Sequence, residues 1–465
     1  MHIEKLIDKK VLVAGGGVTG ASVVHYLSRH DLAFDLVDDG DLPEALASSV
    51  TRGRVHASLD AELSTAYDVI VLSPGIPRAH VAIAAAIEAG VRVIGDIELF
   101  ADGITAPVLA VTGSNGKSTV VAWLTTVLNA CGVNAVACGN IGQPALDSIA
   151  DEVDCYVLEL SSYQLESTES LAPLAATVLN VSEDHLDRYA TLAEYAEVKR
   201  RVHRRAIWTV VNADDAASAP ESRADRHPDG HPDGQPNGQP VRRIVFTLDT
   251  QSTDANWHRR KIEQALWLCN DDKPFVDQSE LALPGDHNAA NALAVLALLT
   301  AYTATVPQSV STATLRDALC GFRGLPHRTE LVADADGVRW YNDSKGTNVD
   351  ACIKAVVAMP GPVLLIAGGL AKGADFTPLV AVAARHCRAV VLIGRDRHAI
   401  ERALSGVVEV HLAETLHDAV QRCLGIADTG DVVLLSPACA SFDMFLDFED
   451  RGRQFTARVR EALAA

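Results

Sequence analysis

The stretch from Val111 to Thr119 constrains the fold more than any other part of this sequence. It reads Val-Thr-Gly-Ser-Asn-Gly-Lys-Ser-Thr, with an apolar run at 107–110 before it and a helix-patterned run at 120–128 after it. This order predicts a strand, a glycine turn and a helix whose N-terminal N–H groups face phosphate oxygens. We therefore expect a nucleoside triphosphate site. Val111 stands where the full phosphate-loop pattern has glycine, which leaves a chance turn as the alternative.

Polar side chains that suit a metal ion follow two further predicted strands. Glu159 comes directly after the strand predicted at 156–158, and His185 follows the strand predicted at 176–180. The ends of parallel strands beside a phosphate loop are where Mg²⁺ ligands belong. A lone histidine after a strand is more often a surface residue, so it is the combination with the phosphate loop that predicts a metal site.

Length, charge and cysteine spacing limit the number of domains and the classes of protein to which the chain can belong. A chain of 465 residues is too long for one ordinary core, and two to four domains are expected. Its net charge of −20 disfavours binding to nucleic acids or anionic membranes. No window approaches the ~18 to 20 apolar residues of a membrane span, and the first residues lack a signal peptide pattern, so a cytoplasmic location is expected. The nine scattered cysteines form no CxxC pair, which argues against disulfides and structural zinc.

The first hundred residues predict a Rossmann-like domain. A strand at 10–14 leads into Gly-Gly-Gly-Val-Thr-Gly at 15–20, then into a helix pattern, and a second strand at 33–37 ends at Asp38. This is the context of a dinucleotide-binding G-x-G-x-x-G, and taken alone it would indicate NAD. The alternative is that the glycines only allow close packing.

The rest of the chain continues the alternation of strands and helices. Residues 192–205 predict a helix with a basic C-terminal half, and the segment 217–242 is a low-complexity insert of turn-forming residues. The polar cluster at 341–348 is more typical of a site than of a linker. Together with strands expected near 363, 389 and 431, these patterns predict an α/β fold of three domains, at 1–102, 103–325 and 326–465.

Seven ordered motifs resemble the Mur ligase family. The last two of them, together with the segment 95–99, are most like its D-glutamate-adding members. The resemblance runs from about residue 10 to 456 and explains Val111, because the family's phosphate loop is T-G-x-N-G-K-S/T. The chain departs from the family at Leu370, where an acidic residue is common, and is about one residue short between Tyr189 and Lys199. The seven motifs lie at 112–119, 139–142, 159–165, 180–188, 324–328, 342–345 and 436–441.

The resemblance implies a Rossmann-like N-terminal domain for a UDP-sugar substrate, a central P-loop ATPase domain with a mostly parallel sheet, and a C-terminal Rossmann-like domain that brings the amino acid. It implies a cytoplasmic, monomeric enzyme of peptidoglycan precursor synthesis. That enzyme would use ATP to add D-glutamate to UDP-N-acetylmuramoyl-L-alanine through an acyl phosphate. The resemblance also implies two Mg²⁺ sites and a carbamylated lysine.

The resemblance also implies a role for each residue that matches a family motif. The uridine diphosphate end would contact Val18, Thr19, Asp38, Ser73 and Gly75. ATP would contact Gly113, Ser114, Asn115, Gly116, Lys117, Ser118, Thr119, Asn288, Asn291, Arg328 and Asp343. D-glutamate would contact Lys345, Thr347, Lys372, Ser441 and Phe448. The metal ligands would be Ser118, Glu159, His185 and the carbamate of Lys199, and the catalytic set would be Lys117, Asn140, His185 and Lys199.

Two other classes of function stay open at this point. One is a related ligase with a different amino acid, or an enzyme like folylpolyglutamate synthase, which shares the central domain. The N-terminal glycine motif speaks against the folate enzyme. The other is an NAD-binding regulator with a vestigial ATP site, for which the segment 15–20 and Asp38 are the basis.

Overall fold

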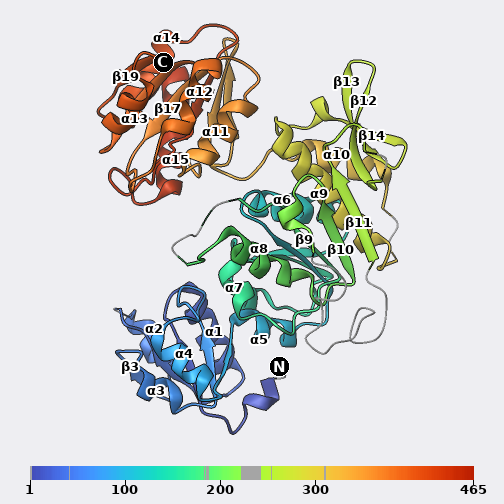
Figure 1. Cartoon of the computed structure of the whole chain (residues 1–465), viewed down its shortest axis with the longest axis vertical. Coiled ribbons are helices and arrows are strands. Elements are labelled where there is room, and N and C mark those ends of the chain that lie inside the picture. Colours follow the sequence, from blue (N-terminus) through green and yellow to red (C-terminus); the bar gives the residue numbers. More distant parts are fainter. Residues whose placement is uncertain are drawn as a thin grey trace. The chain divides into compact units, whose positions relative to one another are not determined.

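The computed structural model describes residues 3–40, 42–182, 184, 188–220, 242–252, 254–307 and 310–464 (Figure 1). His185 and most of the insert predicted at 217–242 lie outside these ranges. The chain forms three sheets and divides into two compact units. The first unit is Met1–Val276 with Ala290–Leu319, and the second is Asp277–Ala289 with Cys320–Ala465.

The first sheet has five parallel strands in the order β3-β2-β1-β4-β5. Successive side chains of a strand point to opposite faces, so Val11 and Val13 pack toward α1 and α5, whereas Leu12 and Ala14 pack toward α4. Burial of both faces explains the uninterrupted apolar strands. The elements are η1 Ile3–Leu6, β1 Val11–Ala14, α1 Val18–Arg29, β2 Asp35–Val37, α2 Glu44–Ser48, β3 Val55–His56, α3 Ala61–Thr65, β4 Val69–Leu72, α4 Val81–Glu88, β5 Arg92–Ile94 and α5 Asp96–Gly103.

The phosphate-loop strand lies inside the second sheet, with six strands on one side and two on the other. Its order is β14-β13-β12-β11-β10-β9-β6-β8-β7, and β6 pairs in parallel with β8 and β9. The elements are β6 Val108–Thr112, α6 Lys117–Ala130, β7 Ala135–Gly139, η2 Ala145–Ser148, β8 Cys155–Glu159, α7 Ser162–Glu166, β9 Ala175–Val178, α8 Leu192–Arg200, η3 Arg201–His203, β10 Trp208–Asn212, η4 Ala216–Ser218, β11 Arg242–Thr247, β12 Trp257–Ile262, β13 Ala265–Asn270, β14 Lys273–Asp277, η6 Gln278–Glu280, α9 Asp286–Thr303 and α10 Thr312–Gly321.

Two features of this sheet differ from the sequence expectation. The helix expected at 192–205 ends as an α-helix at Arg200 and continues as the 3₁₀ turn η3. The strands β12 and β13 form an antiparallel hairpin that the sequence did not predict. The β12 sequence Trp-His-Arg-Arg-Lys-Ile carries three consecutive basic residues and therefore lacks the apolar alternation of a half-buried strand.

The third sheet lies wholly in the second unit and has the order β15-β16-β20-β17-β18-β19. The pair β15–β16 is antiparallel, whereas the other pairs are parallel. One face packs on α11, α12 and α13, and the other on α14 and α15. The elements are β15 Glu330–Ala335, β16 Val338–Asn342, α11 Val349–Ala358, β17 Val363–Gly368, α12 Thr377–His386, β18 Cys387–Ile393, α13 Arg397–Leu404, β19 Glu409–Leu412, α14 Leu416–Ile426, β20 Val432–Leu435 and α15 Phe448–Ala464.

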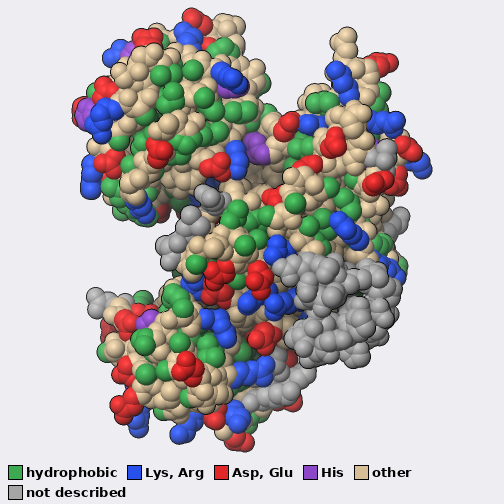
Figure 2. Space-filling view, viewed as in Figure 1, with side chains coloured by type: hydrophobic (Ala, Val, Ile, Leu, Met, Phe, Trp, Pro, Cys, Tyr) green, Lys and Arg blue, Asp and Glu red, His purple; other side chains and the backbone are tan. Residues whose placement is uncertain are grey.

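The surface carries both signs of charge. On the face shown in Figure 2, Asp and Glu side chains are interspersed with Lys and Arg side chains. Among the helices of the described ranges, none combines the length and the apolar character that a membrane crossing requires.

One apolar cluster joins the first two sheets within the first unit. It includes side chains of β1 and α1 together with side chains of β6 and β8. Phe100 of α5 is fully buried in this cluster, and its ring meets the ring of Tyr156 edge to face at a centroid distance of 5.2 Å. Because this contact links the sheets, they form one compact unit although the sequence expectation separates them near residue 102.

We predict that Phe100→Ala lowers the free energy of unfolding by about 3 to 5 kcal/mol, because it leaves a cavity in this shared cluster. Urea denaturation followed by circular dichroism measures the change. Val81→Ala is the matched control, since the Val81 side chain is 75% exposed and its truncation opens no cavity. A loss below about 1 kcal/mol for Phe100→Ala would show that the cluster does not join the sheets energetically.

Candidate functional site

The glycine turn between β6 and α6 has the backbone shape that the sequence predicts. Gly116 has a φ of 84°, a left-handed conformation that favours glycine. A Cβ added there would lie 2.7 Å from Oδ1 of Asn291, which places Asn291 against the turn. Ser118 lies in the first turn of α6 and is 5% exposed, and Thr119 follows it in the same helical turn. The turn thus leads into the N-terminus of α6, whose first N–H groups suit an anion.

The segment after β9 holds the turn in place. The Asn180 carbonyl accepts from the N–H of Ser114 at 2.9 Å, and the Asn180 side chain accepts from the N–H of Asn115 at 2.8 Å. The Ser182 N–H donates to the Ser114 hydroxyl at 3.0 Å. No role was predicted for Asn180 and Ser182, although both belong to the motif at 180–188.

Two lysines converge on one carbonyl oxygen of the turn. Lys117 Nζ donates to the Gly113 carbonyl at 2.8 Å, and Lys199 Nζ of α8 donates to the same oxygen at 2.9 Å. Lys199 is 1% exposed and lies over the ring of Tyr195 at 4.4 Å. Burial, followed by the charge of Lys117, lowers the pKa of Lys199 to about 6. At neutral pH Lys199 is therefore mostly an uncharged amine.

Glu159 presents a carboxylate oxygen suited to a cation. It ends β8, is 1% exposed, and accepts from Asn140 Nδ2 at 2.8 Å through Oε1. Its Oε2 is buried without a hydrogen-bond partner among the described residues, which is costly unless a cation or water meets it. This orphaned oxygen and a hydroxyl such as that of Ser118 are of the kind that Mg²⁺ prefers. The described ranges hold no group of three His, Cys, Asp or Glu side chains around one point, and His185 lies outside them.

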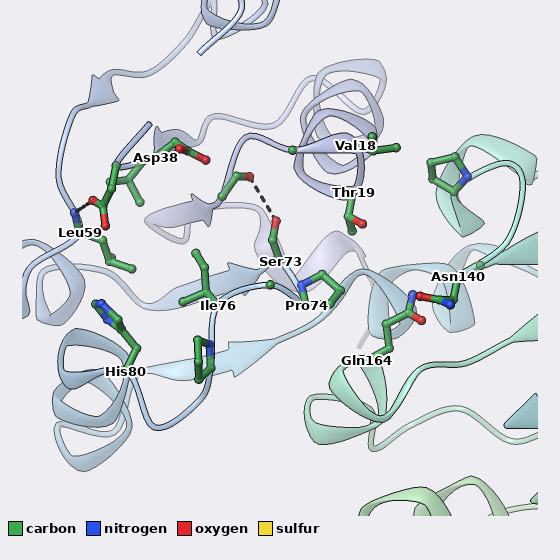
Figure 3. A pocket seen from close by; sticks show the side chains of 18 of the residues that line it. Val18, Thr19, Asp38, Leu59, Ser73, Pro74, Ile76, His80, Asn140 and Gln164 are labelled. Carbon is green, nitrogen blue, oxygen red and sulfur yellow. Dashed lines mark hydrogen bonds between the residues drawn. The ribbon is translucent and has the colours of Figure 1, made fainter. Parts of the chain in front are cut away.

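A pocket of about 580 Å³ opens at the carboxyl edge of the first sheet, a size typical of sites for small molecules. All five residues expected at the uridine diphosphate end line it. In Figure 3, Asn140 and Gln164 lie on one side of the pocket and Asp38 on the other, with Ser73 and Pro74 between them. The residues that line it include Val18, Thr19, Asp38, Ser73, Pro74, Gly75, Asn140 and Gln164.

The loops around the pocket are fixed by their own polar groups. Asp38 accepts from the N–H groups of Gly16 at 2.5 Å and Gly40 at 2.7 Å, and therefore shapes the glycine-rich turn. The Ser73 hydroxyl donates to the Gly15 carbonyl at 3.2 Å. Asp38 and Ser73 thus have a local structural role in addition to any contact with a ligand.

The pair Asp96 and Gln164 was not predicted from the sequence. Gln164 lines the pocket, and its Nε2 donates to Asp96 Oδ2 at 3.3 Å. Desolvation raises the pKa of the fully buried Asp96 to about 6. Asp96 lies in the motif at 95–99, yet nothing local in the sequence shows that it meets a side chain 68 positions away.

In the second unit, the ends of β16, β17 and β20 bring the other expected residues together. Asp343, which follows β16, is 8% exposed and accepts from the Ser436 hydroxyl at 2.7 Å and the Thr329 N–H at 3.1 Å. Burial raises the pKa of Asp343 to about 6. Thr329 and His327, on either side of Arg328, have φ values of 50° and 64°, so Arg328 is flanked by strained backbone.

Lysines and an aromatic ring lie at this same edge. Lys345 Nζ lies 3.9 Å from the centroid of the Phe448 ring. The backbone of Leu370 pairs with that of Ala440, which brings the segment of Lys372 beside that of Ser441. Ser441 is 2% exposed, whereas Lys372 is exposed. Thr347 follows Lys345 in the same loop.

The two asparagines expected near ATP share the start of α9, which crosses from one unit to the other. Asn288 belongs to the second unit, is 4% exposed and donates to the Pro284 carbonyl at 2.8 Å. Asn291 belongs to the first unit and contacts the glycine turn described above.

Each of the three sheets falls wholly or mostly in a segment that matches a known domain family. Residues 9–95 match the Mur ligase MurD-like N-terminal domain, residues 111–299 the Mur ligase middle domain, and residues 327–439 the Mur ligase glutamate ligase domain. Each match contains one of the three sheets or most of it.

Whole-chain comparisons agree with these matches. A protein of Methylobacillus flagellatus called UDP-N-acetylmuramoylalanine--D-glutamate ligase is 43% identical, with 98% of both chains covered. A protein of the same name from Marinobacter nauticus is 42% identical, covering 97% of this chain and 98% of its own.

Solved structures show the same fold at lower identity. A UDP-N-acetylmuramate-alanine ligase of Thermotoga maritima has a TM-score of 0.58 at 17% identity, covering 98% of this chain and 100% of its own. A pseudomurein peptide ligase type C of Methanothermus fervidus has a TM-score of 0.55 at 16% identity, with the same coverage. Because the domain matches follow one another along the chain and the relatives match almost all of it, the chain belongs to the Mur ligase family.

Proposed function

We propose that the chain is an ATP-dependent, ADP-forming ligase that adds D-glutamate to UDP-N-acetylmuramoyl-L-alanine in peptidoglycan precursor synthesis. Asn140 carries the proposal, because it lines the pocket of the first sheet and also donates to Glu159 beside the phosphate loop. One side chain therefore joins a substrate pocket to a phosphoryl-transfer site. The shared name of relatives that span nearly the whole chain supports this choice of substrates.

In the proposed reaction, the alanyl carboxylate attacks the γ-phosphorus of ATP, ADP leaves, and an acyl phosphate forms. The amine of D-glutamate then attacks the acyl carbon, inorganic phosphate leaves, and the amine loses a proton. Lys117 reduces the repulsion between the two anions that meet in the first step. Asn140 orients the substrate toward the γ-phosphate, which the turn from Gly113 to Thr119 holds.

Two Mg²⁺ ions would complete the phosphate site, where they supply positive charge to the phosphate oxygens. Ser118 and Glu159 would hold one of them, and His185 with a carbamylated Lys199 the other. The buried, unpaired Oε2 of Glu159 supports the first assignment. Asn288, Asn291, Arg328 and Asp343 would bind the nucleotide.

The chemistry of Lys199 supports carbamylation. A nucleophilic amine must be uncharged, and the pKa of about 6 leaves Lys199 mostly so at neutral pH. Its lone pair forms an N–C bond to CO₂, and the nitrogen then loses a proton. The product is an anion with two oxygens, which suits Mg²⁺ as a carboxylate does. As an ammonium, Lys199 would instead be repelled by the metal ions.

The second unit would bind D-glutamate through cations and hydroxyls that meet its two carboxylates. Its five proposed contacts are Lys345, Thr347, Lys372, Ser441 and Phe448. We further propose domains at 1–102, 103–325 and 326–465, which each contain one of the three sheets, and a monomeric protein of the cytoplasm.

We predict that phosphate release from ATP requires both UDP-N-acetylmuramoyl-L-alanine and D-glutamate. A colorimetric phosphate assay with D-glutamate, L-lysine, L-alanine or meso-diaminopimelate as the acceptor tests this. Lys117→Ala should abolish turnover without unfolding the chain, because it removes charge and no core volume. Release with another amino acid but not with D-glutamate would refute the substrate assignment, and an active Lys117→Ala would exclude the phosphate loop from the mechanism.

We predict that Lys345→Ala and Ser441→Ala raise the KM for D-glutamate by about ten-fold or more, because each removes a partner of a charged ligand. The KM for ATP should change far less. Steady-state kinetics with each substrate varied in turn measures both. Equal increases for the two substrates would indicate that these residues act in domain closure and do not bind the amino acid.

We predict that Lys199→Ala is nearly inactive and that added acetate partly restores its activity, since a small carboxylate can replace the carbamate. Arg200→Ala is the control, because Arg200 is next along α8 but donates to the Ala217 carbonyl at 3.2 Å. Activity is measured as phosphate release with saturating substrates. Full activity of Lys199→Ala without acetate would contradict carbamylation at this position.

A further inference from the structure

Arg188 uses its whole guanidinium group to join three segments of the first unit. Its Nε and one terminal nitrogen donate to the two carboxylate oxygens of Glu166, at 2.9 and 2.6 Å. Its other terminal nitrogen donates to the Pro74 carbonyl at 2.9 Å. The guanidinium carbon lies 4.1 Å from the centroid of the Tyr163 ring. The side chains of Arg188 and Glu166 are only 9% and 12% exposed.

The partners of Arg188 belong to two segments that form different parts of the wall of the substrate pocket. Pro74 follows β4 of the first sheet and lies next to Ser73 in the pocket wall (Figure 3). Glu166 ends α7 beside the second sheet, two positions after Gln164, which also lines the pocket. A single rigid, planar group therefore bonds to both of these segments at once.

Glu166 is fixed independently of Arg188. The Tyr189 hydroxyl donates to Glu166 Oε1 at 2.7 Å, and an Arg201 nitrogen donates to the Glu166 carbonyl at 3.2 Å. A bidentate pair of this kind sets the direction of the guanidinium as well as its position. The remaining edge of Arg188 then points at the Pro74 carbonyl, which belongs to a turn closed by the bond from the Ile76 N–H to the Ser73 carbonyl at 3.0 Å.

We infer that Arg188 is a positioning residue that fixes the shape of the pocket wall for the UDP-linked substrate. It does not line the pocket itself, and acts by holding the turn of Ser73 and Pro74 at a fixed distance from α7 and Gln164. This inference rests on the proposed function, because it assigns the pocket to the UDP-linked substrate. Glu166 and Tyr163 are the partners through which Arg188 acts.

The test compares Arg188→Lys and Glu166→Gln with the wild-type chain by calorimetric titration of UDP-N-acetylmuramoyl-L-alanine in the absence of ATP. A lysine keeps the charge, but its single ammonium cannot reproduce the fork to Glu166 and the opposite bond to Pro74. We expect about ten-fold or greater loss of affinity in either variant. The double variant should lose no more affinity than the single variant that binds the substrate less tightly, because the two residues act as one unit. The KM values for D-glutamate and ATP should stay at the wild-type level.

Arg397→Lys is the matched control. Arg397 also joins a carboxylate to a backbone carbonyl, with bonds of 2.8 Å to Glu414 and 2.9 Å to the Ala413 carbonyl, but it lies in the second unit. Its substitution should leave the affinity for the UDP-linked substrate unchanged. Thermal unfolding of every variant is recorded, so that titrations are made on folded protein.

The outcomes distinguish a failure of the positioning role of Arg188 from a failure of the proposed function. If the wild-type chain binds the UDP-linked substrate and Arg188→Lys binds it equally, the positioning role is refuted while the proposed function stands. A lower melting temperature with unchanged affinity would likewise refute it and leave Arg188 a purely structural residue. If the wild-type chain does not bind this substrate, the proposed function is refuted and the positioning role falls with it.

Discussion

The hydrogen bonds to the Gly113 carbonyl oxygen are the interactions on which the phosphate site depends. Lys117 and Lys199 both donate to this oxygen, from the first turn of α6 and from the buried face of α8. Two ammonium groups so close together in a buried place would repel each other, and the depressed pKa of Lys199 resolves the conflict. The same geometry that fixes the glycine turn therefore also produces an uncharged, nucleophilic amine beside it.

The short helix α7 connects this site to the substrate pocket. Ser161 and Gln164 form a capping box at its start, and this fixes the orientation of the helix directly after Glu159. Gln164 then reaches the pocket and Asp96, while Glu166 holds Arg188 against the turn at Pro74. Five helical residues thus contribute to both regions that the proposed reaction must bring together.

Features of the fold and of the candidate site could be predicted from the sequence where they depend on residues close together in the chain. The turn at 113–116 and the strand and helix around it were predicted because glycine spacing and apolar runs are local signals, and the third sheet was predicted likewise. Helix α7 is too short to show a 3.6-residue period, and the hairpin β12–β13 is too polar to show alternation. The partners of Arg188 and Asp96 come from distant segments, so only the folded chain could bring them together.

The most direct test of the central claim is ¹³C NMR spectroscopy of the folded chain in buffer with ¹³C-labelled bicarbonate. If the site holds Lys199 as an uncharged amine that takes up CO₂, a carbamate resonance appears above the Lys199 pKa of about 6 and fades as the pH falls through it. The fading follows because a protonated amine has no lone pair to attack CO₂. Lys199→Gln should lack the resonance at every pH. A wild-type spectrum identical to that of Lys199→Gln would contradict the account.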